Sequence, residues 1–147
     1  YAAYSHDSEI VRNSSSGGIF YELAKCIIEE GGVVYGAAFG DDFTLEHRRI
    51  ERIEDIKPLM QSKYMQSNAY KTFEFIKKDL EDKRRVLFVG TPCQIAALRR
   101  LYSKNEDMLI LVDFKSHQHQ QFFGRTILKM VGHMWLKNMQ SVIELIF

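Results

Sequence analysis

The sequence predicts an α/β fold, in which a mostly parallel or mixed central sheet is flanked by layers of helices. Three short apolar segments, 33–39, 86–89 and 108–112, suit buried strands, and segments with helical periodicity separate them. The order strand, helix, strand predicts that the last two segments pair in parallel through a right-handed crossover. We therefore expect 86–89 and 108–112 to be neighbouring strands, both in the interior of the sheet.

Length and composition limit the classes of protein to which the chain can belong. Its 147 residues, 46% of them hydrophobic, suit one domain or an incomplete part of a larger protein, and Tyr1 in place of a starting Met predicts a missing upstream part. The net charge of +1, without a basic stripe, argues against nucleic-acid and membrane-surface partners. Two cysteines are too few for a disulfide scaffold, which predicts a reduced, cytoplasmic chain. No apolar run approaches the roughly 20 residues of a membrane-spanning helix.

The first predicted helix follows a run of serine and glycine. Residues 14–18 open an amphipathic segment whose apolar residues repeat every three to four positions, and Gly31 and Gly32 close it. This pattern predicts a helix of about three turns that starts near Ser16, with a serine cap at its start and glycine at its end.

The next segments predict two strands and a polar connection. Segment 33–39 is apolar and bounded by glycines, as buried strands are, and 40–42 suits a turn. The weak alternation of 45–50 predicts a returning outer strand. Pro58 interrupts the following segment, which predicts a short helical turn before a polar loop at 61–67.

The second half of the predicted domain alternates helices with strands. A helix is expected from Asn68, with apolar residues repeating every three to four positions, and it ends in the charged run 79–85. Strand 86–89, a helix that starts near Pro92 and strand 108–112 then follow.

The turn from Gly90 to Gln94 carries the clearest local pattern. Thr91 suits the N-cap of a helix, Pro92 suits its first position, and Gln94 stands where a capping box has Glu or Gln. Capping leaves Cys93 unexplained. A cysteine in the first turn of a helix, beyond the carboxyl end of a parallel strand, meets the positive end of the helix dipole, which favours the thiolate or metal ligation. The position of Cys93 alone is compatible with either a functional or a structural role.

Ser14, Ser15, Ser16, Gly17 and Gly18 form a second candidate, before the first predicted helix. Backbone N–H groups at a helix N-terminus bind phosphate, and glycine permits its close approach. Three consecutive hydroxyl groups exceed what a helix cap requires. The segment is therefore a candidate for phosphate or cofactor contact, with a plain helix cap as the alternative.

The polar loop is a third candidate, because it concentrates a cation, a phenol, an amide and two hydroxyl groups. The residues concerned are Ser62, Lys63, Tyr64, Gln66 and Ser67. A solvated surface loop with a capping serine is the alternative, and composition alone favours it.

Other candidate ligands have weaker patterns. His117, His119 and His133 lack an acidic or cysteine partner at metal-ligand spacing. Cys26, beside the apolar face of the first helix, is expected to be an inert core thiol. The chain has no Walker phosphate loop, G-x-G-x-x-G or G-x-S-x-G motif, so the usual nucleotide-binding and hydrolase interpretations have no residues to support them.

Taken together, four segments resemble the coenzyme F420 hydrogenase/dehydrogenase beta-subunit family. They occur here in the family's order and approximate spacing, at 12–20, 31–39, 62–67 and 86–94, and read RNSSSGGIF, GGVVYGAAF, SKYMQS and VLFVGTPCQ. Each motif alone is weak, whereas the ordered set is specific. The resemblance runs over residues 1–113.

The resemblance implies a flavoprotein that binds FAD and iron–sulfur clusters and passes electrons between clusters, flavin and a reducible partner such as a deazaflavin. An electron donor or acceptor protein or domain would be its partner. Segments 14–18, 62–67 and 90–94 then resemble the walls of the flavin site, and Cys93 resembles either a cluster ligand or a thiol beside the flavin. Residues 1–114 form the family-like flavin-binding region.

Residues 115–147 depart from the family as a divergent C-terminal segment. Family members have Cys-His-Gly-x-Pro-Ser where this chain has Phe-Lys-Ser-His-Gln-His-Gln, at 114–120. A divergent copy and a frameshifted or fragmentary gene both account for the difference. We expect a helix around 122–134 and a last strand at 141–147.

These departures leave alternatives to redox function. Cys26 and Cys93 alone cannot complete a cluster, so an iron–sulfur cluster is expected to be incomplete or absent in this chain. One alternative is a degenerate, non-catalytic binding or interaction module. Another is an accessory protein of polysaccharide biosynthesis, although no residue points to a glycan.

Overall fold

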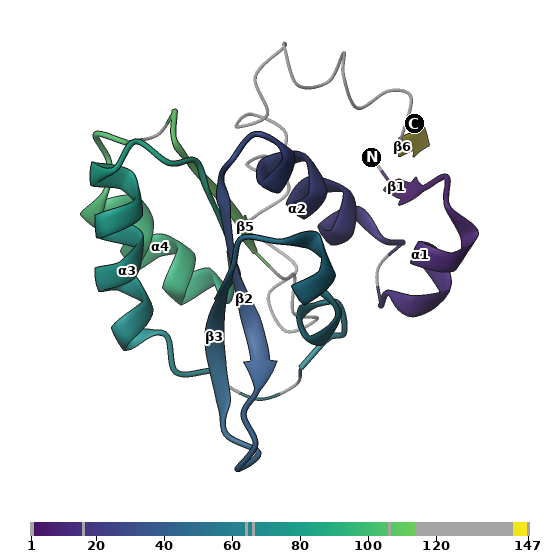
Figure 1. The fold of residues 1–147 in the computed structure, drawn as a ribbon, viewed down its shortest axis with the longest axis horizontal. Coiled ribbons are helices and arrows are strands. Elements are labelled where there is room, and N and C mark those ends of the chain that lie inside the picture. Colours follow the sequence, from purple (N-terminus) through teal and green to yellow (C-terminus); the bar gives the residue numbers. More distant parts are fainter. Residues whose placement is uncertain are drawn as a thin grey trace.

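The computed structural model describes residues 2–15, 17–63, 65, 67–105, 107–113 and 143–146, and a mixed four-stranded sheet forms its centre (Figure 1). Its strands, in the spatial order β3-β2-β4-β5, are β3 Leu45–Ile50, β2 Val33–Phe39, β4 Val86–Gly90 and β5 Leu109–Asp113. β2 and β3 form an antiparallel hairpin, whereas β2, β4 and β5 run parallel. The predicted α/β class and the parallel pairing of the last two strands are confirmed.

Helices cover both faces of the sheet, as Figure 1 shows. α3 Tyr70–Glu81 and α4 Pro92–Leu101 lie on one face, and α2 Ile19–Glu29 lies on the other with the 3-10 turns η1 Ile53–Asp55 and η2 Lys57–Leu59. Successive strand residues point to opposite faces, so alternate apolar side chains supply two separate core clusters. Covering both faces accounts for the continuous apolar runs of β2 and β4.

The interior position expected for the strand at 108–112 is wrong, because the corresponding strand β5 lies at the edge of the described sheet. Its burial alternates: Leu109 and Leu111 are buried, whereas Ile110 and Val112 are half-buried. Ile110 and Val112 still pack against the core cluster on the α2 side, which keeps this edge strand apolar.

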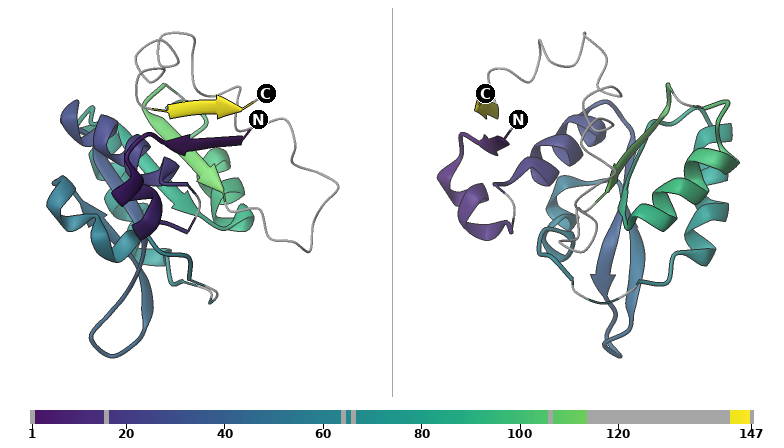
Figure 2. Two further views of the ribbon diagram at one scale, coloured as in Figure 1. Left: turned by 90° about the vertical axis from the view of Figure 1, so that its right-hand side faces the viewer. Right: turned by 180° about the vertical axis from the view of Figure 1, so that it is seen from behind.

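A second, two-stranded sheet joins the two ends of the described chain. β1 Ala2–Ser5 pairs antiparallel with β6 Ile143–Ile146, and Figure 2 shows the two strands side by side. β6 confirms the predicted last strand, whereas the sequence analysis missed β1. Next to this sheet, the Ser5 hydroxyl donates a hydrogen bond to the buried Glu22 carboxylate of α2. The helix expected around 122–134 lies outside the described residues.

The start of α2 differs from the expected serine cap. A short helix, α1 Ser8–Asn13, precedes it, and Ser14 is the residue that ends α1. Gly18 is the N-cap of α2, with a φ of +80°. A Cβ atom on Gly18 would come within 2.7 Å of Ile10 Cγ2, so only glycine suits this left-handed turn.

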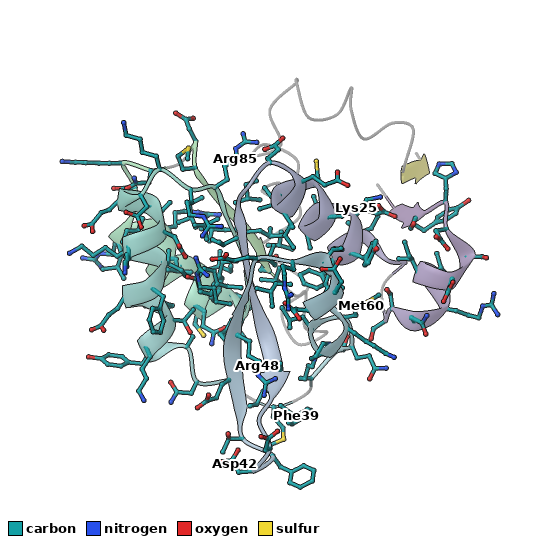
Figure 3. All side chains as sticks on the ribbon, in the orientation of Figure 1. Lys25, Phe39, Asp42, Arg48, Met60 and Arg85 are labelled. Atoms are coloured by element: carbon teal, nitrogen blue, oxygen red, sulfur yellow. The ribbon has the colours of Figure 1, made fainter. Side chains whose placement is uncertain are left out.

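The β2–β3 hairpin extends beyond the helices, and its end carries exposed aromatic rings. Phe39 is 44% exposed and Phe43 is 82% exposed. Figure 3 places Phe39 and Asp42 at this end, where Asp42 Oδ1 accepts the Thr44 N–H at 3.1 Å. No helix of the described residues is both long and apolar enough to cross a membrane.

Candidate functional site

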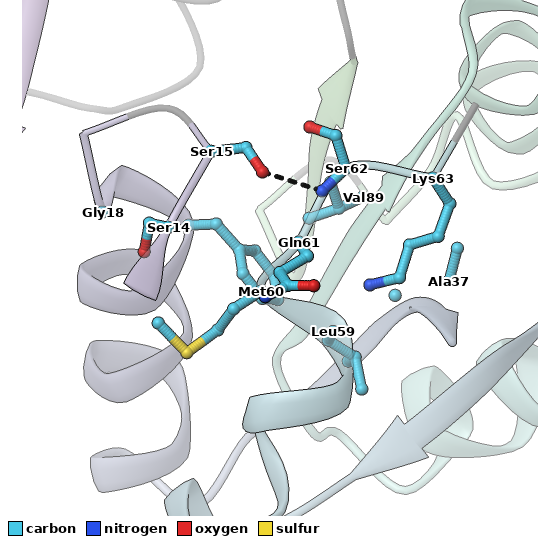
Figure 4. Close-up of a pocket in the computed structure, with 12 residues that line it drawn as sticks. Ser14, Ser15, Gly18, Ala37, Leu59, Met60, Gln61, Ser62, Lys63 and Val89 are labelled. Carbon is cyan, nitrogen blue, oxygen red and sulfur yellow. Dashed lines mark hydrogen bonds between the residues drawn. The ribbon is translucent and has the colours of Figure 1, made fainter. Parts of the chain in front are cut away.

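A small pocket lies where α2 begins, near the carboxyl ends of β2 and β4 (Figure 4). We call it the serine–lysine pocket, and its cavity measures about 70 Å³. Its lining residues are Ser14, Ser15, Gly18, Phe20, Gly36, Ala37, Leu59, Met60, Gln61, Ser62, Lys63 and Val89. In open α/β sheets, ligands bind at the carboxyl ends of the strands.

Two of the candidate segments meet at this pocket. The Ser62 N–H donates a hydrogen bond to Ser15 Oγ at 2.9 Å, across a sequence separation of 47 residues (Figure 4). Gly17 and Gly18 follow with φ values of +65° and +80°, so the chain turns sharply into α2. Of the other candidates in these segments, Ser16, Tyr64 and Gln66 lie outside the described residues.

Lys63 supplies the cation at this pocket. It is half-buried, and its Nζ donates to the Pro58 carbonyl oxygen at 2.6 Å. Burial lowers the pKa of the Lys63 ammonium group. Within the described ranges, no carboxylate forms a salt bridge with Lys63. In Figure 4 its side chain turns from the loop back toward the pocket, where its charge can meet an anion.

A glycine on β2 permits the close packing of η2 under the pocket. A Cβ atom on Gly36 would lie 2.9 Å from Leu59 Cδ2 and 3.2 Å from Leu59 Cγ. Leu59 is 7% exposed, so it has little room to move away. Gly36 therefore lets η2, and with it the loop that carries Ser62 and Lys63, approach the sheet.

The third candidate segment starts α4 at the same end of the sheet but does not line the pocket. Thr91 is the N-cap, Pro92 opens the helix, and Gln94 Oε1 accepts the Thr91 N–H at 2.9 Å, so the predicted capping box is confirmed. A Cβ atom on Gly90 would lie 2.5 Å from Phe88 Cε1 and 2.7 Å from Gln94 Oε1. Gly90 is therefore required by the packing of this turn.

His47, which was not among the predicted site residues, connects the polar loop at 61–67 to the end of β4, just before the turn that starts α4. His47 Nδ1 lies 3.0 Å from Ser67 Oγ, and His47 Nε2 lies 3.0 Å from the Val89 carbonyl oxygen. The imidazole stacks on Phe88 with ring centroids 4.6 Å apart. Burial lowers the pKa of His47, and the bond to the Val89 carbonyl offsets this only in part. No local motif marks His47, because its partners come from other elements.

The two cysteines lie on different helices. Cys93 is exposed at the start of α4, with its Sγ 3.1 Å from Thr91 Oγ1. Cys26 is half-buried on α2, where burial and then Glu30 and Glu29 raise the pKa of its thiol. The described part of the chain holds no group of three or more His, Cys, Asp or Glu side chains suited to a metal ion.

The donors at the serine–lysine pocket suit an anionic oxygen group. Serine hydroxyls, the backbone of a glycine turn at a helix N-terminus and a lysine ammonium group are the usual ligands of phosphate. The cavity of about 70 Å³ is much smaller than the roughly 300–1,000 Å³ of a site that encloses a whole ligand. These residues therefore fit the phosphate part of a nucleotide cofactor, and the remainder of that cofactor would lie outside the cavity. The described cysteines do not fit an iron–sulfur cluster.

Comparison with known proteins gives a structural similarity. No family model matches the chain, and no curated protein sequence matches it. Among solved structures, it is similar to a chain of the F420-reducing NiFe hydrogenase complex from Methanosarcina barkeri, with a TM-score of 0.56 and 26% sequence identity. The match covers 69% of this chain and 36% of that chain. The chain is thus structurally similar to part of a subunit of an F420-reducing hydrogenase complex.

Proposed function

We propose that this chain is the FAD-binding part of an F420-type oxidoreductase subunit. In this proposal, electrons pass between iron–sulfur centres, the flavin and a reducible partner such as a deazaflavin. The observation that carries it is the hydrogen bond between Ser62 and Ser15, which brings a serine–glycine turn and a lysine-bearing loop to one pocket. Similarity to a chain of an F420-reducing complex supports the redox context.

The serine–lysine pocket is proposed to hold the phosphates of FAD. Ser14 and Ser15 offer hydroxyl groups, Gly17 and Gly18 present the backbone at the start of α2, and Lys63 offers a cation. The helix dipole of α2 adds partial positive charge at the same place. When bound, FAD supplies electron transfer, whereas the protein supplies binding and orientation. Ser16, Tyr64 and Gln66 belong to the proposed site as neighbours in sequence.

The start of α4 is proposed as the second wall of the flavin site. Gly90, Thr91, Pro92 and Gln94 lie at the carboxyl end of β4, next to Val89 of the serine–lysine pocket. Cys93 presents an exposed thiol at this wall. We propose that this thiol faces the flavin or the electron-transfer partner.

The iron–sulfur centres of the proposal belong to other parts of the assembly. Cys26 and Cys93 lie on separate helices, and no described third ligand joins either of them. The match to 36% of the hydrogenase-complex chain leaves most of such a subunit outside this chain. Residues 1–114 would form the flavin-binding region, and residues 115–147 a C-terminal addition.

A non-catalytic binding module is the second candidate function. The small cavity and the lack of a described cluster site favour it, because a module that binds only an anionic group needs neither a ring pocket nor metal ligands. Onward electron transfer from bound flavin separates the two functions. A chemical reductant reduces flavin in either case, but only an oxidoreductase is expected to catalyse transfer of those electrons to a deazaflavin.

Titration of FAD with the chain tests the proposed pocket. Quenching of flavin fluorescence gives the dissociation constant for the wild type and for Lys63→Gln. Loss of a charge-assisted contact to phosphate costs about 1.5–3 kcal/mol, so the variant is expected to bind at least about tenfold more weakly. Lys25→Gln is the matched control, because Lys25 lies exposed on α2 and contacts Glu29 at 4.0 Å. Equal affinity in the wild type and Lys63→Gln would contradict the proposal.

A further inference from the structure

The loop that carries Ser62 and Lys63 crosses the end of the sheet and is held on both sides. On the α2 side, the Ser62 N–H is bonded to Ser15 Oγ at 2.9 Å. On the α3 and α4 side, the buried Ser67 closes the loop beside His47. Directly after Ser67, Asn68 pairs with Glu46 of the edge strand β3 in a parallel bridge.

The contacts of His47 determine which ring nitrogen carries the proton. A carbonyl oxygen only accepts hydrogen bonds, so the 3.0 Å contact with Val89 requires Nε2–H on His47. The neutral ring then has a lone pair on Nδ1, which accepts the hydroxyl proton of Ser67 at 3.0 Å. Of the two neutral tautomers, only Nε2–H satisfies both contacts.

The chain of hydrogen bonds continues into α4. Gln94 Nε2 donates to the Ser67 carbonyl oxygen at 3.1 Å and lies 3.3 Å from Ser67 Oγ. Gln94 Oε1 accepts the Thr91 N–H at 2.9 Å. One polar path therefore connects β3, the loop and the start of α4, with Ser67 at its centre between His47 and Gln94.

We propose that His47 is a positioning residue for the serine–lysine pocket: its Nε2–H holds Val89, which lines the pocket, and its Nδ1 holds Ser67, which anchors the loop that carries Lys63. This inference rests on the proposed flavin function. His47 does not line the pocket, so its effect on a cofactor passes through these two neighbours.

Protonation of His47 would reverse its bond to Ser67. The imidazolium ion has N–H groups at both positions, so Nδ1 would donate to Ser67 Oγ, and the hydroxyl proton of Ser67 would have to turn to another acceptor. The groups that contact the ring are uncharged: the Ser67 hydroxyl, the Val89 carbonyl and the Phe88 ring. On β3 itself, the neighbouring charged residues Glu46 and Arg48 alternate to the other face.

The sign of the pH dependence follows from the burial of His47. Burial lowers the pKa of His47 more than the bond to Val89 raises it. The unfolded imidazole takes up its proton near pH 6.5 and the folded one only at lower pH. The stability that the neutral ring contributes is therefore complete above about pH 6.5, and the arrangement in the folded chain is lost as the pH falls through the lower folded pKa.

A first experiment examines the ring without any cofactor. Nitrogen-15 NMR of the imidazole groups of the full chain distinguishes the two neutral tautomers and follows their titration. We expect His47 to be an Nε2–H tautomer at pH 7.5 and to take up its proton below the ordinary imidazole value near pH 6.5. An Nδ1–H tautomer, or titration of His47 at or above pH 6.5, would overturn the inference.

A second experiment measures the effect on the pocket. His47→Phe keeps a ring on Phe88 but removes both hydrogen bonds, whereas His47→Asn retains an acceptor near Ser67. Dissociation constants for FAD and amide exchange of Ser62 and Thr91 are measured at pH 7.5, with His6→Phe as control. We expect His47→Phe to weaken FAD binding about tenfold, with faster exchange at both amides, because the binding-competent loop falls to about a tenth of the population. His47→Asn is expected to recover part of the loss.

The outcomes separate this inference from the proposed function. If wild-type chain binds FAD and His47→Phe binds it equally with unchanged amide exchange, the positioning role of His47 is overturned. If wild-type chain fails to bind FAD, the proposed function fails. In the wild type, FAD affinity that is constant above about pH 6.5 and falls in step with the protonation of His47 followed by NMR supports the inference, and affinity that stays constant while His47 takes up its proton contradicts it.

Discussion

The absence of a Cβ atom at Gly36 allows η2, and the loop that follows it, to pack close to β2 at the candidate site. The atom would lie 2.9 Å from Cδ2 of Leu59, a buried member of the core cluster on the α2 side. We expect Gly36→Ala to lower the free energy of unfolding by about 1–3 kcal/mol, as overpacking in cores does. Urea unfolding followed by circular dichroism measures this change.

A compensating substitution supplies the control for Gly36→Ala. Leu59→Val removes one methylene group from the side chain that Gly36→Ala would strike, so the double variant should lose less stability than the two single losses combined. Additive losses would show that the contact with Leu59 is not the reason for glycine at this position.

The two thiols offer a second test at the scale of single residues. Cys93 is exposed, whereas burial raises the pKa of the half-buried Cys26. Iodoacetamide reacts with the thiolate, so at pH 7.5 Cys93 should be alkylated well before Cys26. Mass spectrometry of the native protein at successive times measures both rates. Equal rates would contradict the assignment of Cys93 as the accessible thiol.

Single residues were predictable from the sequence where their role is local. Thr91, Pro92 and Gln94 follow capping rules that span four positions, and the structure shows that helix start. His47 was not predictable, because its partners Ser67 and Val89 come from other elements and meet it only after the sheet has formed.

At the scale of elements, an ion pair between the partly exposed Arg49 and the buried Asp79 joins three parts of one sheet face. Arg49 of β3 donates to Asp79 of α3 through Nε at 2.8 Å and Nη2 at 2.6 Å, and the Tyr35 hydroxyl of β2 donates to the same carboxylate. Burial would raise the pKa of Asp79, but the bonds from Arg49 and Tyr35 outweigh it and hold that pKa below its ordinary value.

Asp79→Asn should therefore reduce stability and change its pH dependence. Because the folded pKa is depressed, the contribution of Asp79 is present above about pH 4 and is lost as the pH falls further. At pH 7 the variant should lose about 3 kcal/mol, the lower end for a broken buried pair, since Arg49 keeps its contact with Glu51. Urea unfolding from pH 7 to pH 3 measures both effects.

An exposed ion pair serves as the control for Asp79→Asn. Asp55 accepts from Arg52 Nε at 3.0 Å with both side chains in solvent, so Asp55→Asn should change stability by less than about 1 kcal/mol. Equal effects of the two substitutions, or a variant whose acid sensitivity matches the wild type, would contradict the role of Asp79.

A helix or strand could be predicted when a continuous run of its own residues carries the apolar or helical pattern. β2, β4, α3 and α4 have apolar runs or helical repeats long enough to identify, and all four form. α1 has six residues, fewer than two helical turns, and β1 depends on pairing with β6 from the far end of the chain. The edge position of β5 depends on strand order, which no segment encodes alone.

At the scale of the whole molecule, the fold brings distant segments to one end of the sheet. Ser14, Ser15 and Gly18 precede α2, Ser62 and Lys63 follow η2, and Val89 lies near the carboxyl end of β4, yet all of them line one cavity. The sequence predicted polar candidates in each segment. The parallel order of β2, β4 and β5 explains why they converge, because the carboxyl ends of parallel strands share an edge.

Amide NMR with added FAD tests the proposed pocket most directly. In nitrogen–proton correlation spectra of the chain, FAD should shift the backbone signals of Gly17, Gly18, Ser62 and Lys63 more than those of α3, on the opposite face of the sheet. Inorganic pyrophosphate should shift part of the same set, because the pocket is proposed to hold phosphate groups. Absence of shifts, or shifts confined to α3 and the β2–β3 hairpin, would contradict the account of this chain as a flavin-binding domain.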